Sequence, residues 1–278
     1  MTRQLTFAQQ VERSIIKTYR KEIWNPFVKA VKDYRLIAPE DKIAVCISGG
    51  KDSMLLAKCM QQLQRFSDFP FSLEFVCMDP GYHEVNRRQI ETNAEKLQVP
   101  IKFFETNIFD VTESVSGNPC YLCARMRRGH LYSIAKSLGC NKIALGHHLS
   151  DVIETTLLGM FYGAQLQAML PRLKSTNFEG MELIRPLYCV NEDAILKWKL
   201  YNGLDFIQCA CRFVDEYSHS EDGIGPSKRQ EIKALIKEMR KDNPDVERNI
   251  FMSIHNLKLD TFIGYKQDGT EHSFLEKF

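Results

Sequence analysis

Six consecutive residues, Ser48-Gly49-Gly50-Lys51-Asp52-Ser53, combine two glycines with a lysine, a carboxylate and two hydroxyls. Glycine lets the backbone turn tightly, so successive N–H groups can face one point, where a following helix adds the positive end of its dipole. Lys51 brings a full positive charge to the same place. This composition favours a phosphate-binding loop over a purely structural turn, because a turn needs the glycines but not the other four side chains.

The loop differs from the Walker A phosphate loop G-x-x-x-x-G-K-[ST]. No glycine stands at Ile47 or in the residues just before it, and Asp52 follows the lysine. The apolar run before the loop predicts a strand over 42–47. Asp52 and Ser53 are expected to cap a helix that begins near Met54.

Four cysteines have the spacing of metal ligands. Cys120 and Cys123 form a C-x2-C pair at the start of an expected helix, and Cys209 and Cys211 lie far downstream. Four thiolates would hold a closed structural zinc, whereas three would hold an iron–sulfur cluster with one open iron. The spacing alone leaves both metals possible, and a redox dithiol as well.

Four other cysteines, Cys46, Cys59, Cys77 and Cys140, stand in or beside predicted strands and helices and are expected to be small core residues. The chain has 278 residues, nine of them cysteine, and a polar N-terminus unlike a signal peptide. Reduced thiols and a cytoplasmic location are therefore expected, with no membrane span.

Acid and base candidates follow a later strand, in Gly146-His147-His148-Leu149-Ser150-Asp151. His147 and Asp151 are the candidates for moving a proton. Ser150 or Asp151 is expected to cap the next helix, and at most one of the two adjacent histidines is expected to face a site. A structural role is an equal alternative for either histidine.

Short β-rich runs alternate with helical runs through the middle of the chain. Strands are predicted over 42–47, 72–78, 100–105 and 141–146, and helices over 53–65, 83–97 and 151–163. This alternation predicts an α/β fold, a doubly wound parallel sheet with helices on both faces. Ligands of such sheets bind at the carboxyl ends of the strands, which brings Ser48–Ser53, Met78-Asp79 and Gly146–His148 to one rim.

Helical segments are expected at both ends of the chain. Residues 7–24 have a helical period, and Pro26 begins a second helix, so 1–38 is expected to be an N-terminal helical cap on a nucleotide domain over 39–217. Residues 218–278 form a C-terminal extension. Its helix 227–242 is expected to bury a stripe consisting of Ile232, Leu235, Ile236 and Met239.

Taken together, these motifs resemble one family, the TtcA-like tRNA-cytidine 2-sulfurtransferases of the N-type ATP pyrophosphatase (PP-loop) superfamily. The resemblance spans residues 20–257 and rests on S-G-G-K-D-S, P-C-x-L-C-x-R-x-R-R-G at 119–129 and A-L-G-H-H-x-x-D at 144–151. It continues through M-F-Y-G at 160–163, L-P-R-L at 170–173 and I-R-P-L at 184–187. Two positions depart from the family pattern: Ser150 stands where an aspartate is usual, and the later cysteines read Cys-Ala-Cys.

The resemblance implies an enzyme that adenylates the C2 oxygen of a tRNA cytidine, at position 32, and replaces it with sulfur, releasing AMP and pyrophosphate. It implies that Ser48–Ser53 bind ATP with Lys51 on the pyrophosphate, and that Met78, Asp79 and Gly146 line the nucleotide site. Asp79 has a helix cap as its alternative role. Mg²⁺ is expected on Asp52, and a [4Fe–4S] cluster on Cys120, Cys123 and Cys209, with Cys211 as the alternative third ligand.

The implied partners are the tRNA anticodon loop and a sulfur donor, either a cysteine desulfurase or sulfide, and a homodimer is expected. The net charge of +2 is too small to indicate RNA binding, so local clusters such as Arg125, Arg127 and Arg128 would have to provide it. Three alternatives remain: the same chemistry on another tRNA pyrimidine, on a small sulfur-containing metabolite, or a non-catalytic nucleotide-binding protein with structural zinc.

Overall fold

The structure is a computed structural model, and it describes residues 4–106, 108, 119–207 and 228–278. The chain forms two compact units. The first consists of Met1–Val152 and Met169–Gly225, and the second of Ile153–Ala168 and Pro226–Phe278. Each unit is described by itself below.

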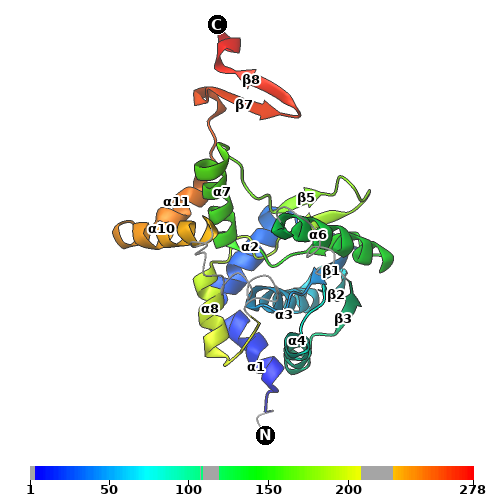
Figure 1. Ribbon diagram of the computed structural model, residues 1–278. Coiled ribbons are helices and arrows are strands. Elements are labelled where there is room, and N and C mark those ends of the chain that lie inside the picture. Colours follow the sequence, from blue (N-terminus) through cyan, green and yellow to red (C-terminus); the bar gives the residue numbers. More distant parts are fainter. Residues whose placement is uncertain (1–3, 107, 109–118, 208–227) are drawn as a thin grey trace, which may run out of the picture. The chain divides into compact units, whose positions relative to one another are not determined.

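The first unit begins with helices and continues into alternating strands and helices (Figure 1). Its helices are α1 (Phe7–Arg13), the π-helical turns η1 (Ser14–Thr18) and η2 (Arg20–Trp24), α2 (Asn25–Asp33), α3 (Lys51–Phe66), α4 (Glu84–Leu97), α6 (Pro119–Ser137), the start of α7 (Leu149–Gly163), and α8 (Glu192–Tyr201). Its strands are β1 (Lys42–Cys46), β2 (Ser72–Asp79), β3 (Ile101–Glu105), β4 (Lys142–Ala144), β5 (Arg172–Lys174) and β6 (Glu182–Ile184).

In the described part of the chain these six strands form one sheet in the order β3-β2-β1-β4-β6-β5. All neighbours are parallel except the edge pair β5 and β6. The chain runs outward from β1 to β3 and then returns to place β4 on the other side of β1. The carboxyl ends of β1 and β4 therefore flank a topological switch point, where open α/β sheets bind their ligands.

Both faces of the sheet are buried, as its apolar strands require. Ile43 and Val45 of β1 belong to one core with α3, α4, α8 and the N-terminal helices, whereas Ala44 and Cys46 belong to another with α6. Alternate residues of a strand point to opposite faces, which explains this division. The predicted doubly wound α/β fold is confirmed, and the predicted strands and central helices match within three residues.

The N-terminal residues fold less regularly than the periodicity suggests. Instead of one helix over 7–24, α1 ends at Arg13 and two π-helical turns carry the chain to Trp24. Ile15 and Ile23 are nonetheless fully buried in the larger core. The apolar period thus identifies the buried face but not the exact winding of the backbone.

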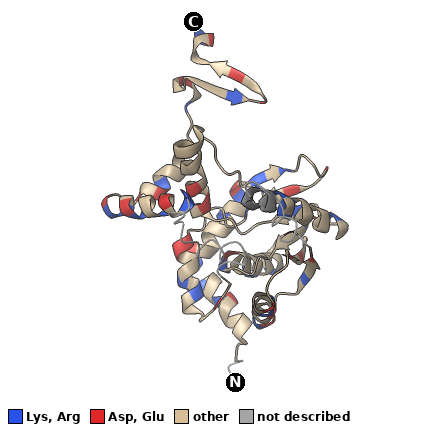
Figure 2. Cartoon of the chain, viewed as in Figure 1, with Lys and Arg blue, Asp and Glu red and all other residues tan. Residues whose placement is uncertain are grey.

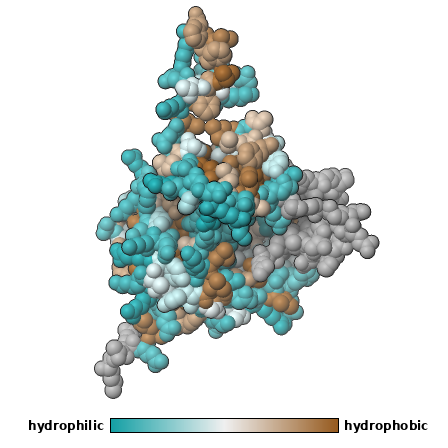
Figure 3. All heavy atoms as spheres, turned by 90° about the vertical axis from the view of Figure 1, so that its left-hand side faces the viewer, coloured by the Kyte–Doolittle hydropathy of each residue, from teal (hydrophilic) through white to brown (hydrophobic). Residues whose placement is uncertain are grey.

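The second unit contains most of α7 together with α10 (Lys228–Asp242), α11 (Val246–Ser253), the turns η3 (Leu259–Thr261) and η4 (Phe274–Lys277), and an antiparallel hairpin, β7 (Gly264–Gln267) and β8 (Thr270–Ser273). Ile232 and Ile236 of α10 are buried as predicted, but Leu235 and Met239 are 40% and 43% exposed. The buried stripe is therefore narrower than expected, because only one i, i+4 row of α10 is covered. The C-terminal turn η4 exposes Leu275 and Phe278. The C-terminal segment, at the top of Figure 1, includes brown, hydrophobic atoms in Figure 3.

None of the described helices has the length and apolar character that crossing a membrane requires.

A buried ion pair joins α1 to α3. The Lys58 ammonium is fully buried and donates to Oε1 of Glu12 at 2.7 Å and to the Leu97 carbonyl at 2.8 Å, and Arg65 donates to Oε2 of Glu12 at 2.7 Å. Burial raises the pKa of Glu12, but the hydrogen bonds from Arg65 and Lys58 outweigh it, so the pKa is lowered overall. A buried charge of this kind is costly once its partner is removed.

We expect Glu12→Gln to lower the free energy of unfolding by about 3 kcal/mol at pH 7, because it leaves the Lys58 ammonium buried without its carboxylate. Urea denaturation measures the change. Since the folded pKa of Glu12 lies below 4.5, the difference between wild type and variant should shrink as the pH falls below that value. Glu22→Gln on the exposed face of η2 is the matched control, and an equal effect of both variants would contradict the prediction.

Candidate active site

The glycine loop after β1 leads directly into a helix. α3 begins at Lys51, three residues earlier than predicted, because two glycines complete the turn, and its N-cap residue, Gly50, provides no side chain. The prediction that Asp52 and Ser53 cap this helix is therefore wrong. Ser53 Oγ instead accepts a hydrogen bond from the Ser48 N–H at 3.2 Å and donates to the Gly50 carbonyl at 2.9 Å, which closes the loop on itself.

Two glycines at this loop lie so close to other atoms that a Cβ would not fit without a shift, Gly49 beside a side chain and Gly146 beside the backbone. Gly49 has a φ of +83°, and a Cβ there would lie 2.5 Å from Cγ1 of Ile90. Gly146, after β4, would place a Cβ 3.1 Å from the backbone carbon of Asp52 and 3.1 Å from the backbone nitrogen of Ser53. The segment leaving β4 thus packs directly against the first turn of α3, which an alanine would push away.

Lys51 is held by two carboxylates. Its ammonium lies 3.1 Å from Oδ2 of Asp52 and 3.0 Å from Oε1 of Glu192, at the start of α8. Burial acts to lower the pKa of Lys51, but Asp52 and Glu192 outweigh it and the pKa is raised. The lysine is therefore charged at neutral pH and positioned at the loop. No local sequence pattern marks Glu192 as a site residue, because it comes from a distant helix.

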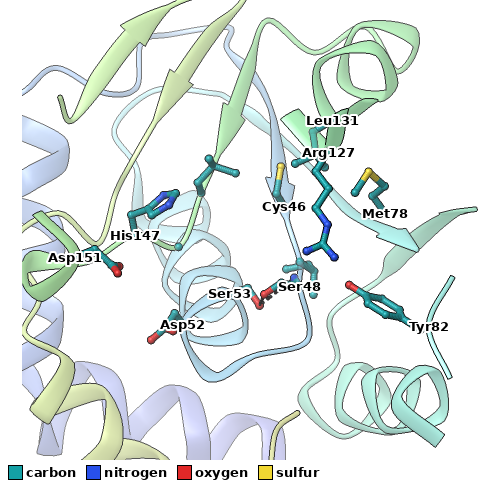
Figure 4. A pocket seen from close by; sticks show the side chains of 13 residues that line it. Cys46, Ser48, Asp52, Ser53, Met78, Tyr82, Arg127, Leu131, His147 and Asp151 are labelled. Atoms are coloured by element: carbon teal, nitrogen blue, oxygen red, sulfur yellow. Dashed lines mark hydrogen bonds between the residues drawn. The ribbon is translucent and has the colours of Figure 1, made fainter. Parts of the chain in front are cut away.

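A cavity of about 310 Å³ opens at the carboxyl ends of β1 and β4 (Figure 4). Seven of the predicted site residues line it: Ser48, Asp52, Ser53, Met78, Gly146, His147 and Asp151. They come from the loop after β1, from β2, α3 and α7, and from the segment after β4, so the structure brings together groups that are about 100 residues apart. The remaining predicted residues of the loop, Gly49, Gly50 and Lys51, support the cavity without lining it.

One corner of this cavity is acidic. Oδ1 of Asp52 is buried and has no hydrogen-bond partner among the described residues, with Nε2 of His148 at 3.7 Å. Oδ2 of Asp151 accepts from the His148 backbone N–H at 3.0 Å and lies 3.4 Å from its Nδ1. The buried His148 ring thus lies between two carboxylates, while His147 lines the cavity itself.

The acidic corner is not a complete metal site. No group of three or more His, Cys, Asp or Glu side chains within the described ranges is arranged to hold a metal ion. A Mg²⁺ ion usually takes one or two carboxylates and completes its shell with water and phosphate oxygens. Asp52, with its unused buried oxygen, is the described residue best suited to such a site.

The opposite wall combines apolar side chains with one cation. Cys46, Leu131 and Leu145 line it, and Figure 4 shows the Arg127 guanidinium and the Tyr82 hydroxyl directed into the cavity beside Ser48. The sequence predicts Cys46 only as a core residue and contains no pattern that marks Tyr82 as a site residue. It predicts Arg127 only as one of several RNA-contacting cations, although its position four residues before Leu131 on α6 places both on one helix face.

The two residues at the end of β2 have different surroundings. Met78 lines the cavity, whereas the Asp79 carboxylate accepts from the backbone N–H groups of Gly81 and Tyr82 at 2.9 and 2.7 Å and from Arg87 at 2.7 Å. Asp79 therefore closes the turn after β2. It does not take the helix-capping role given as its alternative, because the N-cap residue of α4 is His83 and no side chain caps that helix.

Cys120 and Cys123 lie in the first turn of α6, but their side chains are outside the described part of the structure, as is Cys209. The four cysteines predicted as core residues, Cys46, Cys59, Cys77 and Cys140, are buried as free thiols. Burial raises the pKa of Cys77 to about 12 and that of Cys140 to about 11. These thiols are therefore protonated at neutral pH.

The parallel sheet, the glycine loop after its first strand and the cavity at the switch point define a PP-loop domain, and the model of that domain matches residues 12–218. The chain belongs to the tRNA-cytidine(32) 2-sulfurtransferase family of PP-loop proteins. It is 34% identical over 241 residues to the protein of that name from Geobacter sulfurreducens, an alignment that covers 86% of this chain and 90% of the relative. A relative of the same name from Bdellovibrio bacteriovorus is 36% identical over 241 residues, covering 86% and 88%.

A solved structure shares the fold. The U34-tRNA thiolase NcsA from Methanococcus maripaludis, determined with its [4Fe-4S] cluster, superposes with a TM-score of 0.65 at 21% identity, covering 83% of this chain and 76% of that one. This likeness concerns the fold.

We expect Gly146→Ala to weaken ATP binding by about tenfold, because the added methyl meets backbone atoms of Asp52 and Ser53 that cannot rotate away. Isothermal titration with a non-hydrolysable ATP analogue measures the affinity. Gly129→Ala is the control, since a Cβ there meets nothing within 4 Å. Equal affinities for the two variants would show that the close contact is unimportant.

Proposed function

We propose that this protein uses ATP to adenylate the C2 oxygen of cytidine 32 in tRNA and then replaces that oxygen with sulfur. The observation that carries the proposal is the glycine loop in a switch-point cavity that also holds Asp52, His147 and Asp151, in a chain whose relatives are named for this reaction. The C2 oxygen of a pyrimidine is a poor leaving group. Adenylation converts it into AMP, which leaves readily.

The loop supplies the electrostatic part of this reaction. The first-turn N–H groups of α3 have no partners within the helix and face an anion bound at Ser48–Ser53. Lys51 adds a charge that Asp52 and Glu192 keep in position. These groups stabilise the departing pyrophosphate while the α-phosphorus meets the base oxygen.

Asp52 is proposed as the carboxylate that holds Mg²⁺, because its buried Oδ1 lacks a hydrogen-bond donor among the described residues. When bound, Mg²⁺ would offset phosphate charge. His148 keeps the Asp52 and Asp151 carboxylates apart and oriented. Asp151 or His147, both lining the cavity, would take the proton released as sulfur replaces oxygen.

Cys120, Cys123 and Cys209 are proposed as the ligands of a [4Fe–4S] cluster. Residues 120, 123, 127 and 131 follow one another along α6 at a spacing of three or four, and Arg127 and Leu131 line the cavity. Three thiolates suit such a cluster by their chemistry. When bound, it would leave one iron without a protein ligand, a place for an incoming sulfide.

The wider partners follow from the same reaction. The sulfur would come from a cysteine desulfurase or from sulfide, and the enzyme would act as a homodimer on the anticodon loop. The cytidine must leave the base stack to reach the cavity, as bases of RNA loops do when proteins read or modify them.

Asp52→Asn tests the reaction. Anaerobic full-length protein with ATP, Mg²⁺, sulfide and unmodified tRNA should form 2-thiocytidine, detected by nucleoside mass spectrometry. We expect the variant to lose about a hundredfold in rate, since it removes the proposed metal ligand, while its melting temperature stays close to that of wild type. Asp68→Asn, an exposed carboxylate, is the control. Wild type that forms no thiolated cytidine would overturn the proposal.

Metal and sulfide counts test the ligands. Anaerobically purified wild type should carry about four irons and four sulfides per chain. Cys209→Ala should lose most of both, whereas Cys211→Ala should retain them. If only Cys211→Ala loses iron and sulfide, then Cys211 and not Cys209 is the third ligand. If wild type contains stoichiometric zinc and no iron, the proposed cluster is contradicted.

A further inference from the structure

A second hollow in the first unit lies on another side of α6. It is a groove of about 510 Å³ between α6 and the turn that joins β5 to β6. The lining residues that matter here are Arg125, Arg128, Tyr132, Lys174, Ser175 and Phe178. Among the described residues, no acidic side chain lines it.

The cations of this groove are not neutralised by the residues that the structure describes. Arg125, Arg128 and Lys174 are exposed, and none forms an ion pair with a described residue. The neighbouring Arg172 differs, since it binds Glu182 at 2.8 Å and the Arg35 carbonyl at 2.7 Å. Figure 2 shows the blue segments of α6 and β5 that carry these charges. Exposed unpaired cations gathered in one groove provide a binding site for polyanions.

A fixed floor supports the groove. The rings of Tyr132 and Phe178 stack with centroids 5.2 Å apart, and the Phe178 N–H donates to Ser175 Oγ at 3.1 Å. Burial and the nearby Arg128 guanidinium lower the pKa of Arg185 to about 10. An anion beside Arg128 would relieve this repulsion.

The groove and the nucleotide cavity share one helix. Arg127 and Leu131 line the cavity, whereas Arg128 and Tyr132, one residue further along, line the groove. One residue turns an α-helix by about 100°, so the two rows lie on adjacent faces. A chain bound in the groove would lie one helix width from the reacting phosphates.

We propose that this groove binds the phosphodiester backbone of the tRNA substrate, with Arg128 and Lys174 as the principal phosphate contacts and Arg125 as a third. The proposal rests on the proposed function for the identity of the RNA. Phosphate contacts fix the register of an RNA without reading its sequence. The groove would thus orient the anticodon loop while the cavity performs the chemistry.

The test compares two double variants of the full-length protein. Arg128→Gln/Lys174→Gln removes two groove charges, and Lys32→Gln/Lys96→Gln removes two exposed lysines of α2 and α4 that form no ion pair with described residues. Binding of an unmodified tRNA transcript is followed by fluorescence anisotropy at several salt concentrations. We expect the groove variant to bind roughly tenfold more weakly, with a log K against log [salt] slope smaller by about 2, and the control to match wild type.

Arg128→Lys/Lys174→Arg, which keeps both charges, should recover most of the affinity, and ATP binding should be unchanged in every variant. If the groove variant and the control variant bind tRNA equally well, the proposal that the groove binds tRNA is overturned, even if wild type thiolates tRNA. Wild type that binds tRNA through the groove but forms no thiolated base would instead overturn the sulfur chemistry. Wild type that does not bind tRNA would overturn both.

Discussion

The contact between Gly146 and the first turn of α3 is the constraint on which the site depends. It exists because β4 is inserted beside β1, so that two segments almost 100 residues apart leave the sheet at the same point. Only a residue without a side chain permits their backbones to approach to van der Waals distance. This approach brings His147 and Asp151 to the phosphate loop, so the strand order itself assembles the acid–base groups with the anion cradle.

The titratable side chains around the loop lie close to one another and keep one another in position. Lys51 lies between Asp52 and Glu192, and His148 lies between Asp52 and Asp151. Asp52 therefore has the Lys51 ammonium on one side and the His148 ring on the other, yet its Oδ1 has no hydrogen-bond donor in the described part of the chain. Since a buried carboxylate oxygen without a donor is costly, the arrangement favours an added cation.

Much of the fold could be predicted from the sequence because strand and helix periods are local properties. The glycine loop was recognisable for the same reason, since its residues are consecutive. Glu192 could not be found, because its role depends on how α8 packs beside α3 rather than on any local pattern. Tyr82 cannot be predicted for a similar reason. The helix α3 begins earlier than predicted because Gly50 ends the turn without a capping side chain. The departure at Ser150 has a structural use: its Oγ accepts from the Glu192 N–H at 3.3 Å and thereby ties α7 to the start of α8.

Helix α6 shows how one element can serve two surfaces at once. Its face with Leu131 and Arg127 completes the nucleotide cavity, and the adjacent face contributes Arg128 and Tyr132 to the groove. The first turn of the same helix contains Cys120 and Cys123. A small rotation of α6 would therefore move a cavity wall, the groove cations and the cysteine pair together. The stacking of Tyr132 on Phe178 and the packing of Ala135 in the second core oppose such a rotation, so the core on this side of the sheet fixes the relation between both surfaces.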